Sequence, residues 1–278
     1  MSAAPIIAAT EPIGPADADL LVLGPSLGTS SLLWNRVSPM LAERYRVVAW
    51  DLPGHGASPA IDRPFDVAEL ADEVVAIADR LGVERFWAAG ISMGGATGLE
   101  LGLRHGDRLH AVAVVASGAL LGAPDAWRDR AALVRSQSTS AVILPSAERW
   151  FAPGTAASDP DLTGRLLHVL QEADDESYAR CCEALAAFDV IDRLGGIRTP
   201  LLALWGEVDV AAPEERSALI AEHVPGARIA RIDGAAHLPS VDRPVATATA
   251  LLDFFGEVAA GRLAAGGTAA GETAEPVR

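Results

Sequence analysis

Apolar residues along this chain fall into two alternating patterns. Short, nearly continuous apolar runs are typical of parallel strands that are buried on both faces of a sheet. Six such runs predict strands at Leu20–Leu23, Arg46–Trp50, Phe86–Gly90, Ala111–Ala116, Pro200–Trp205 and Ala227–Ile232.

Longer segments between these runs place apolar residues at helical spacing. Phe65–Leu81 has Asp66 near its start and apolar side chains at Leu70, Val74 and Ile77, which favours an amphipathic helix. Further helices are predicted at Met93–Arg104, Pro213–His223 and Pro244–Val258. Alternating strands and helices indicate an α/β fold with a mostly parallel sheet flanked by helices.

The alternation stops between residues 120 and 189. Stretches such as WRDRAALVRSQ and LTGRLLHVLQEA indicate several helices there, and we see no strand-like run. We therefore expect a core made of residues 1–119 and 190–258, with a helical cap inserted at residues 120–189. Residues 259–278 are rich in Ala, Gly, Thr and Glu, which predicts a disordered tail.

Composition and charge narrow the function classes. The 278 residues, half of them hydrophobic, are enough for one sizeable core. The apolar runs are much shorter than the roughly 20 residues that span a bilayer, and the N-terminal stretch lacks a signal-peptide pattern, so we expect a cytoplasmic protein. The formal net charge of −15 argues against nucleic acid or an anionic membrane as partner. It does not argue against a small anionic substrate.

The two cysteines, Cys181 and Cys182, are adjacent. Adjacent cysteines rarely form an ordinary disulfide, and no Cys/His spacing indicates zinc, so we expect them to pack on a helix. The chain has no Walker A pattern, and no G-x-G-x-x-G follows the first predicted strand. The sequence therefore predicts no metal and no cofactor.

The strongest chemical signal is the G-x-S-x-G pattern around Ser92, from Gly90 to Gly94. A predicted strand precedes it and a predicted helix follows, which is the context in which this pattern presents a nucleophilic serine on a sharp turn. The helix N-terminus directs backbone N–H groups at the same place. A chance Gly/Ser turn is the alternative interpretation.

A serine nucleophile needs a base and a group that orients the base. His237, in the loop after the last predicted strand, is the candidate base. Asp209 follows the fifth predicted strand and is the candidate acid, with Glu207 as its competitor. The chain order Ser92, Asp209, His237 fits this pattern, so His55, in DLPGHGAS, is interpreted as a structural loop residue. The other histidines are interpreted as solvated helix or loop residues: His105, His110, His168 and His223.

Two backbone N–H groups are candidates for an oxyanion hole. One belongs to Met93, which follows the nucleophile, and the other to Leu27, in the loop GPSLGTS after the first predicted strand. Gly28 would give this loop its backbone freedom, and an ordinary turn is the alternative.

These residues resemble the α/β-hydrolase superfamily and, more narrowly, the 3-oxoadipate enol-lactonases of the β-ketoadipate pathway of aromatic degradation. SLGT is the most specific match, because many other α/β hydrolases carry a His-Gly pair in that loop. Together with the connecting pattern, the matching segments cover most of Leu20 to Phe255: GPSLGTSSLLW, VVAWDLPGHGAS, GISMGGATGLELGLRHGDRL, AERWF, YARCCEALAAFDV and GAAHLPSVDRP.

The resemblance implies a cytoplasmic serine hydrolase that opens a small anionic enol-lactone to 3-oxoadipate, with Ser92, Asp209 and His237 as a catalytic triad. It also implies that the cap contacts the substrate. Arg149 and Trp150 lie in AERWF, where a guanidinium could meet a carboxylate and an indole could line the pocket. A surface arginine and a core tryptophan are the alternative interpretation.

Two other functions stay open. G-x-S-x-G is widely shared, so a carboxylesterase or another lactonase of this fold, including one of secondary metabolism, fits the same residues. A non-catalytic binding protein on this scaffold is a third hypothesis, and the complete set of catalytic residue types argues against it. The sequence leaves the oligomeric state open.

Overall fold

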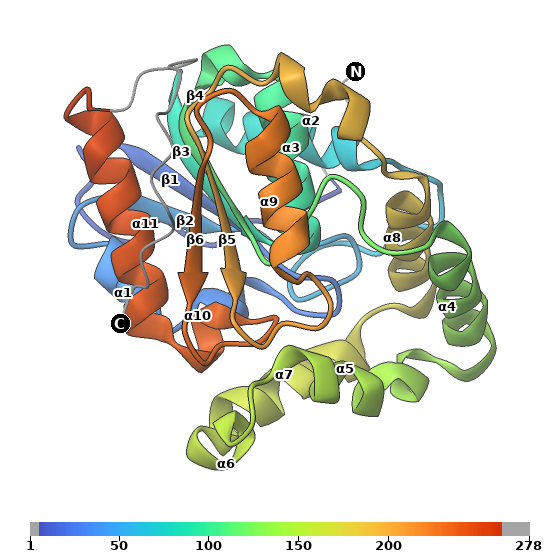
Figure 1. The fold of residues 1–278 in the computed structure, drawn as a ribbon. Helices are drawn as coiled ribbons and strands as arrows, with labels where there is room; N and C mark the ends of the chain where they lie inside the picture. The colour runs from blue at the N-terminus through green and yellow to red at the C-terminus, as the bar shows by residue number, and fades with distance from the viewer. Residues whose placement is uncertain (1–5, 263–278) are drawn as a thin grey trace.

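The computed structural model describes residues 6–262 and contains a six-stranded parallel sheet in the order β2-β1-β3-β4-β5-β6 (Figure 1). All residues of β1, β3 and β5 are buried, as continuous apolar runs predict. The strands confirm the six predictions to within two residues at each end: β1 Leu20–Gly24, β2 Arg46–Ala49, β3 Phe86–Ile91, β4 Leu109–Val115, β5 Leu201–Gly206 and β6 Arg228–Ile232.

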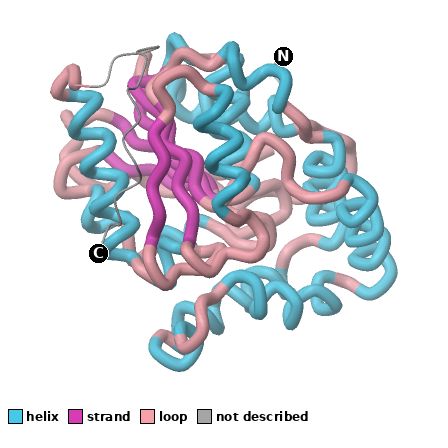
Figure 2. The backbone as a smooth tube through the Cα atoms, in the orientation of Figure 1, coloured by secondary structure: helices cyan, strands magenta, loops and turns pink. Residues whose placement is uncertain are grey.

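Helices cover both faces of the sheet, as Figure 2 shows with the strands in magenta and the helices in cyan. One face carries α1 (Ser38–Leu41) and α11 (Pro244–Ala259), and the other carries α2 (Val67–Arg80), α3 (Met93–Arg104) and α9 (Glu214–His223) (Figure 1). This layering buries the sheet on both sides and leaves its carboxyl-terminal edge for a site.

The start and end of helix α2 show how local sequence determines where a helix begins and ends. The Asp66 side chain accepts a hydrogen bond from the Glu69 amide at 2.8 Å, which caps the helix. Leu70, Val74 and Ile77 are buried on one face. The chain turns away at Gly82, whose φ is +72°, a conformation that glycine adopts without strain.

The chain before β1 pairs with β2 and the residue that follows it, which its sequence pattern does not predict. Ala9 and Ile13 pair with Trp50 and Val47 through isolated antiparallel bridges. Proline has no amide hydrogen to donate, so Pro12 cannot continue a ladder. The segment therefore lies along the edge of β2 without forming a strand.

Between β4 and β5 the chain forms the helical insertion, which we define as helices α4 to α8. Figure 1 shows α5 and α7 across the carboxyl ends of β5 and β6. Leu120 and Asp189 pair in an isolated bridge at the two ends of this segment. The helices are α4 Pro124–Gln137, α5 Ile143–Trp150, α6 Thr155–Ser158, α7 Pro160–Glu172 and α8 Asp175–Ala187.

The remaining short helices are α10 Pro239–Asp242 and the 3₁₀ turns Ser31–Trp34, Gly106–Arg108, Thr139–Val142 and Ile191–Gly196. Cys181 and Cys182 are buried on α8 as free thiols, as expected. Helix α11 ends at Ala259. Of the tail predicted at residues 259–278, the part from residue 263 onward lies outside the described residues. Within residues 6–262, we find no helix both long and apolar enough to cross a membrane.

Candidate active site

Ser92 lies on a strained turn between β3 and α3. Its φ of 56° and ψ of −111° are unusual for a residue with a side chain. Three hydrogen bonds hold the turn: the Ser92 amide donates to Val115 O at 2.9 Å, and the Ser92 carbonyl accepts from the Ala96 amide and from the Ser117 hydroxyl. The strained backbone is therefore fixed from both sides, as G-x-S-x-G in this context predicts.

Gly90 and Gly94 are required by close packing at this turn. A Cβ atom on Gly90 would overlap the carbonyl group of Gly94, and one on Gly94 would lie 2.6 Å from the carbonyl carbon of Gly24. No side chain fits either position without moving backbone. The two glycines therefore let the start of α3 pack against the ends of β3 and β1.

His237 and Asp209 form a buried pair in neighbouring loops at the carboxyl ends of β6 and β5. His237 Nδ1 lies 3.0 Å from Asp209 Oδ2, and the amides of Ala211 and Ala212 donate to Oδ1 of the same carboxylate. Burial alone would raise the pKa of Asp209, but the charge of His237 and these hydrogen bonds lower it below its usual value. Asp209 is therefore a carboxylate that accepts from His237 and fixes its orientation.

The two competing residues have other partners. Glu207, the competitor of Asp209, is exposed and accepts from the Gly234 amide at 2.8 Å. His55 is fully buried; its Nδ1 bonds Pro53 O, and its Nε2 accepts from the Gly28 amide at 3.2 Å. Burial lowers the pKa of His55, which favours the neutral acceptor. His55 thus supports the loop that carries Leu27.

Leu27 and Met93, whose backbone amides are the candidates for an oxyanion hole, lie in the loop after β1 and at the start of α3. Leu27 lines the cavity described below, and Met93 is the first residue of α3. Within the described residues, neither backbone amide donates to a protein acceptor. Gly28 has a φ of +81° and packs against Trp150 and Leu170 of the helical insertion, so its predicted backbone freedom is used.

A cavity of about 260 Å³ lies between the sheet and the helical insertion. On the sheet side, which we define as the loops that follow the strands, its lining includes Ser26, Leu27, Ser92, Val210, Ala211 and His237. On the insertion side, it includes Ala126, Trp127, Arg130, Arg149, Trp150 and Tyr178. The structure therefore brings Ser92, His237, Arg149 and Trp150 to one cavity, with Asp209 behind His237.

Arg130 also lines the cavity, although the sequence pattern did not single it out. Its Nη2 donates to the Ser146 hydroxyl at 2.8 Å, and its guanidinium lies 5.8 Å from the Trp127 ring centre and 5.7 Å from the Tyr178 ring centre. Its buried Nε atom has no hydrogen-bond partner among residues 6–262. The spacing of Trp127 and Arg130 on one helical face is the signal that was present in the sequence.

Arg149 and Trp150 lie at the end of α5. Arg149 Nε donates to Pro145 O in its own helix at 2.9 Å. Burial, and secondarily the charge of Arg130, lower the pKa of Arg149. In the described part of the chain, neither Arg130 nor Arg149 forms an ion pair with a carboxylate. Two unpaired guanidiniums in one cavity favour an anionic ligand.

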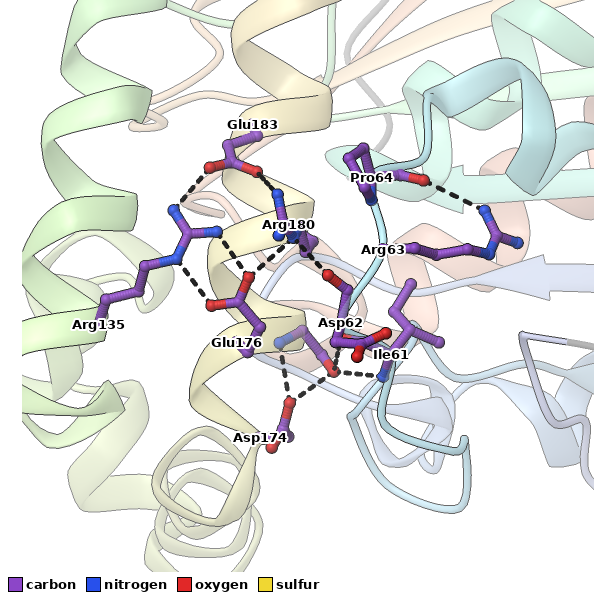
Figure 3. Close-up of polar contacts among 10 residues, drawn as sticks. Ile61, Asp62, Arg63, Pro64, Arg135, Asp174, Glu176, Arg180 and Glu183 are labelled. Carbon is purple, nitrogen blue, oxygen red and sulfur yellow. Dashed lines mark hydrogen bonds and ion pairs between the residues drawn. The ribbon is translucent and has the colours of Figure 1, made fainter.

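A network of charged residues joins α8 of the insertion to neighbouring elements (Figure 3). Arg135 of α4 contacts Glu176 of α8 at 2.7 Å and Glu183 at 2.6 Å. Arg180 contacts both glutamates and donates to Asp62 O. Helix α8 is thereby joined both to α4, which carries Trp127 and Arg130, and to the loop after β2.

The described residues contain no cluster of three or more His, Cys, Asp or Glu that could hold a metal ion. The groups gathered at the cavity are a hydroxyl, an imidazole with its carboxylate, backbone amides and guanidiniums. This set can perform acyl transfer on an anionic ester.

Comparison with known proteins agrees with this geometry. A family model described as the alpha/beta hydrolase fold matches residues 19–244. The chain belongs to the α/β-hydrolase family. This family membership confirms the fold predicted from the sequence, including the parallel sheet flanked by helices.

Two relatives of this α/β hydrolase are named as enzymes that hydrolyse a lactone or an ester. The 3-oxoadipate enol-lactonase 2 of Acinetobacter baylyi is 34% identical over 84% of this chain and 87% of the relative. A pimeloyl-acyl-carrier protein methyl ester esterase of Aeromonas hydrophila is 32% identical over 81% of this chain and 90% of the relative.

Among solved structures, the enol-lactonase from Burkholderia xenovorans LB400 superimposes with a TM-score of 0.87 at 31% identity, covering 90% of this chain and 96% of the other. The predicted resemblance to enol-lactonases is therefore confirmed. This α/β hydrolase is an ester-hydrolysing enzyme that acts on small molecules.

Proposed function

We propose that this enzyme opens 3-oxoadipate enol-lactone to 3-oxoadipate through an acyl-enzyme formed on Ser92. The observation that carries the proposal is the cavity itself, where Ser92 and His237 face Arg130 and Arg149, two cations without a carboxylate partner among the described residues. A substrate with both a lactone carbonyl and a carboxylate would engage both sides.

In the first step, the Ser92 hydroxyl attacks the lactone carbonyl while His237 accepts the hydroxyl proton. Asp209 stabilises the imidazolium that forms. The amides of Leu27 and Met93 donate to the oxyanion. The ring C–O bond then breaks, and the proton on His237 passes to the departing enol oxygen, which gives an acyl-enzyme with the enol still attached.

In the second step, His237 takes a proton from water, and the resulting hydroxide attacks the acyl carbon. The Ser92 oxygen leaves, takes the proton back from His237, and the acid is released. The tethered enol could re-form the lactone by attacking the acyl carbon. Tautomerisation of the enol to the ketone removes this nucleophile and favours hydrolysis.

We assign substrate recognition to the helical insertion and propose that residues 120–189 act as a cap. Arg130 is held by Ser146 and by two aromatic rings, so its guanidinium is oriented before a carboxylate binds. The cavity volume of about 260 Å³ lies below the roughly 300–1,000 Å³ of sites for drug-sized ligands, which favours a small substrate.

The test is to offer the purified protein 3-oxoadipate enol-lactone and to follow ring opening, with Ser92→Ala as the control. Turnover that depends on Ser92 supports the proposal, and absence of such turnover contradicts it. The similarity to enol-lactonases extends the proposal to the β-ketoadipate pathway. The cytoplasmic location stays a prediction.

A carboxylesterase of the same family is the second candidate, because the similarity to a methyl ester esterase favours it. A panel of neutral esters separates the two. Faster turnover of neutral esters than of the anionic lactone would support the esterase. For a non-catalytic binding protein, a fluorophosphonate probe would fail to label Ser92, whereas a serine hydrolase is labelled in the wild type and not in Ser92→Ala.

A further inference from the structure

The loop that carries His237 is attached to the helical insertion on both sides of the histidine. The Leu238 amide donates to Trp150 O at 3.0 Å. The Ala236 amide donates to Asp242 Oδ2 at 2.7 Å, and Asp242 Oδ1 accepts from the Ala152 amide at 3.0 Å. Trp150 lines the cavity, and Ala152 follows it by two residues.

Asp242 is therefore a buried carboxylate that joins two separate parts of the active site. It lies at the end of α10 with 7% of its surface exposed. Its two oxygens accept from the residue before His237 and from the segment after Arg149 and Trp150, and the Thr155 hydroxyl of α6 contacts it as well. Only the deprotonated carboxylate accepts hydrogen bonds fully on both oxygens, because the protonated acid carries a hydrogen on one of them.

We propose that Asp242 is a positioning residue that sets His237 against Ser92 by fixing its loop to the segment of the insertion that lines the cavity. This inference rests on the proposed function. A displacement of about 1 Å in a reacting group can lower a rate about 100-fold, so the two backbone hydrogen bonds on Asp242 bear directly on proton transfer.

A purely structural role for Asp242 would have a different consequence. Burial raises the pKa of Asp242, so the charged form is kept in place at some cost in stability. If the carboxylate only stabilised the fold, its loss would change the stability of the protein and leave the rate at each folded active site unchanged.

The experiment compares Asp242→Asn with the wild type. Asparagine has the same shape, but its amide group would face one of the two N–H donors instead of accepting from it. We expect kcat to fall about 10- to 100-fold, on the lactone and on any neutral ester that the enzyme hydrolyses. KM should stay within about threefold, because the cations that bind the substrate are unchanged.

The rate at which a fluorophosphonate reacts with Ser92 supplies a readout that does not depend on knowing the substrate. It needs His237 as base, so Asp242→Asn should slow it by a similar factor. Thr155→Val, a milder variant that removes only the hydroxyl contact, should give a smaller loss of kcat in the same direction, which keeps the test available if Asp242→Asn fails to fold.

Glu100→Gln is the matched control. Glu100 is also a carboxylate with little exposure, at 4%, and it bonds Arg193 at 2.8 Å, but it lies two turns into α3 and does not touch the His237 loop. Its replacement should change stability and leave kcat within about twofold.

Equal fluorophosphonate rates in the wild type and Asp242→Asn, or a loss confined to KM, would overturn this inference alone. An unlabelled wild type would overturn the proposed function and Asp242's role with it. A kcat loss in Asp242→Asn that Glu100→Gln matches would assign Asp242 a structural role only, and so would also overturn the inference.

Discussion

The two sides of the cavity are built in different ways. On the sheet side, Ser92 is held by backbone bonds to β4 and α3, and Asp209 by two amides. On the insertion side, Arg130 is held by one hydroxyl and two ring faces. Main-chain geometry therefore fixes the side that would perform the chemistry. The side that would select the substrate depends on a few side chains of helices, which can change without disturbing the sheet.

The largest effect should follow from changing the sheet side. Ser92→Ala or His237→Ala should lower kcat on the order of 10⁴-fold, because nucleophile and base act as a unit. Steady-state kinetics on the lactone measure this loss. A loss below about tenfold for either variant would argue against these roles.

A smaller and more selective effect should follow from changing the insertion side. Arg130→Met should raise KM for the anionic lactone about 10- to 100-fold, because a charge-assisted hydrogen bond is worth roughly 1.5–3 kcal/mol. Turnover of a neutral ester should change less than about threefold.

Arg128→Met is the matched control for this variant. Arg128 is on the same helix, is 60% exposed and pairs with Asp125, so its loss should leave KM for the lactone unchanged. Equal effects of the two variants would remove the distinction between the two sides.

Strong acid should weaken the sheet side by protonating Asp209. Its folded-state pKa is lowered, so its contribution to stability is complete above its unfolded value of about 3.9 and is lost as the pH falls through the lower folded value. The free energy of unfolding in urea should differ between wild type and Asp209→Asn by on the order of 1 kcal/mol near pH 7, with the difference shrinking below about pH 4. A difference that grows in acid would contradict this assignment.

The smallest effect should come from the charged network in Figure 3. Arg135→Met removes the contacts with Glu176 and Glu183. Partly exposed ion pairs contribute little, so thermal unfolding should show a loss of about 0.5 kcal/mol with kcat nearly unchanged. A large drop in kcat would mean that this network positions reacting groups, although Arg135, Glu176 and Glu183 do not line the cavity.

The same contrast explains what the sequence could predict. Strand ends and the G-x-S-x-G turn follow local rules, so β3, α3 and the place of Ser92 could be read from neighbouring residues. Asp209 and His237 could be proposed because loops at the carboxyl ends of parallel strands meet at one edge. Glu207 could be set aside only in three dimensions, where it accepts from the Gly234 amide.

The insertion side could not be predicted in the same way. Arg128, Arg130 and Arg135 follow one another on α4. Arg130 shares a helical face with Trp127, but no local rule says which face of the helix meets the cavity. Arg128 pairs with Asp125 and Arg135 with two glutamates of α8, which leaves Arg130 to face the cavity. The packing of α4 against α8 decides this, and Arg149 could be proposed only from the family resemblance.

The most direct test compares two enol-lactones, 3-oxoadipate enol-lactone and the neutral one that carries a methyl group in place of the carboxymethyl group. We predict that kcat/KM of the wild type favours the anionic lactone by at least about tenfold, that Arg130→Met abolishes this preference, and that Ser92→Ala turns over neither. Equal kcat/KM values for the two lactones in the wild type would contradict the proposal that the insertion selects an anionic substrate for Ser92.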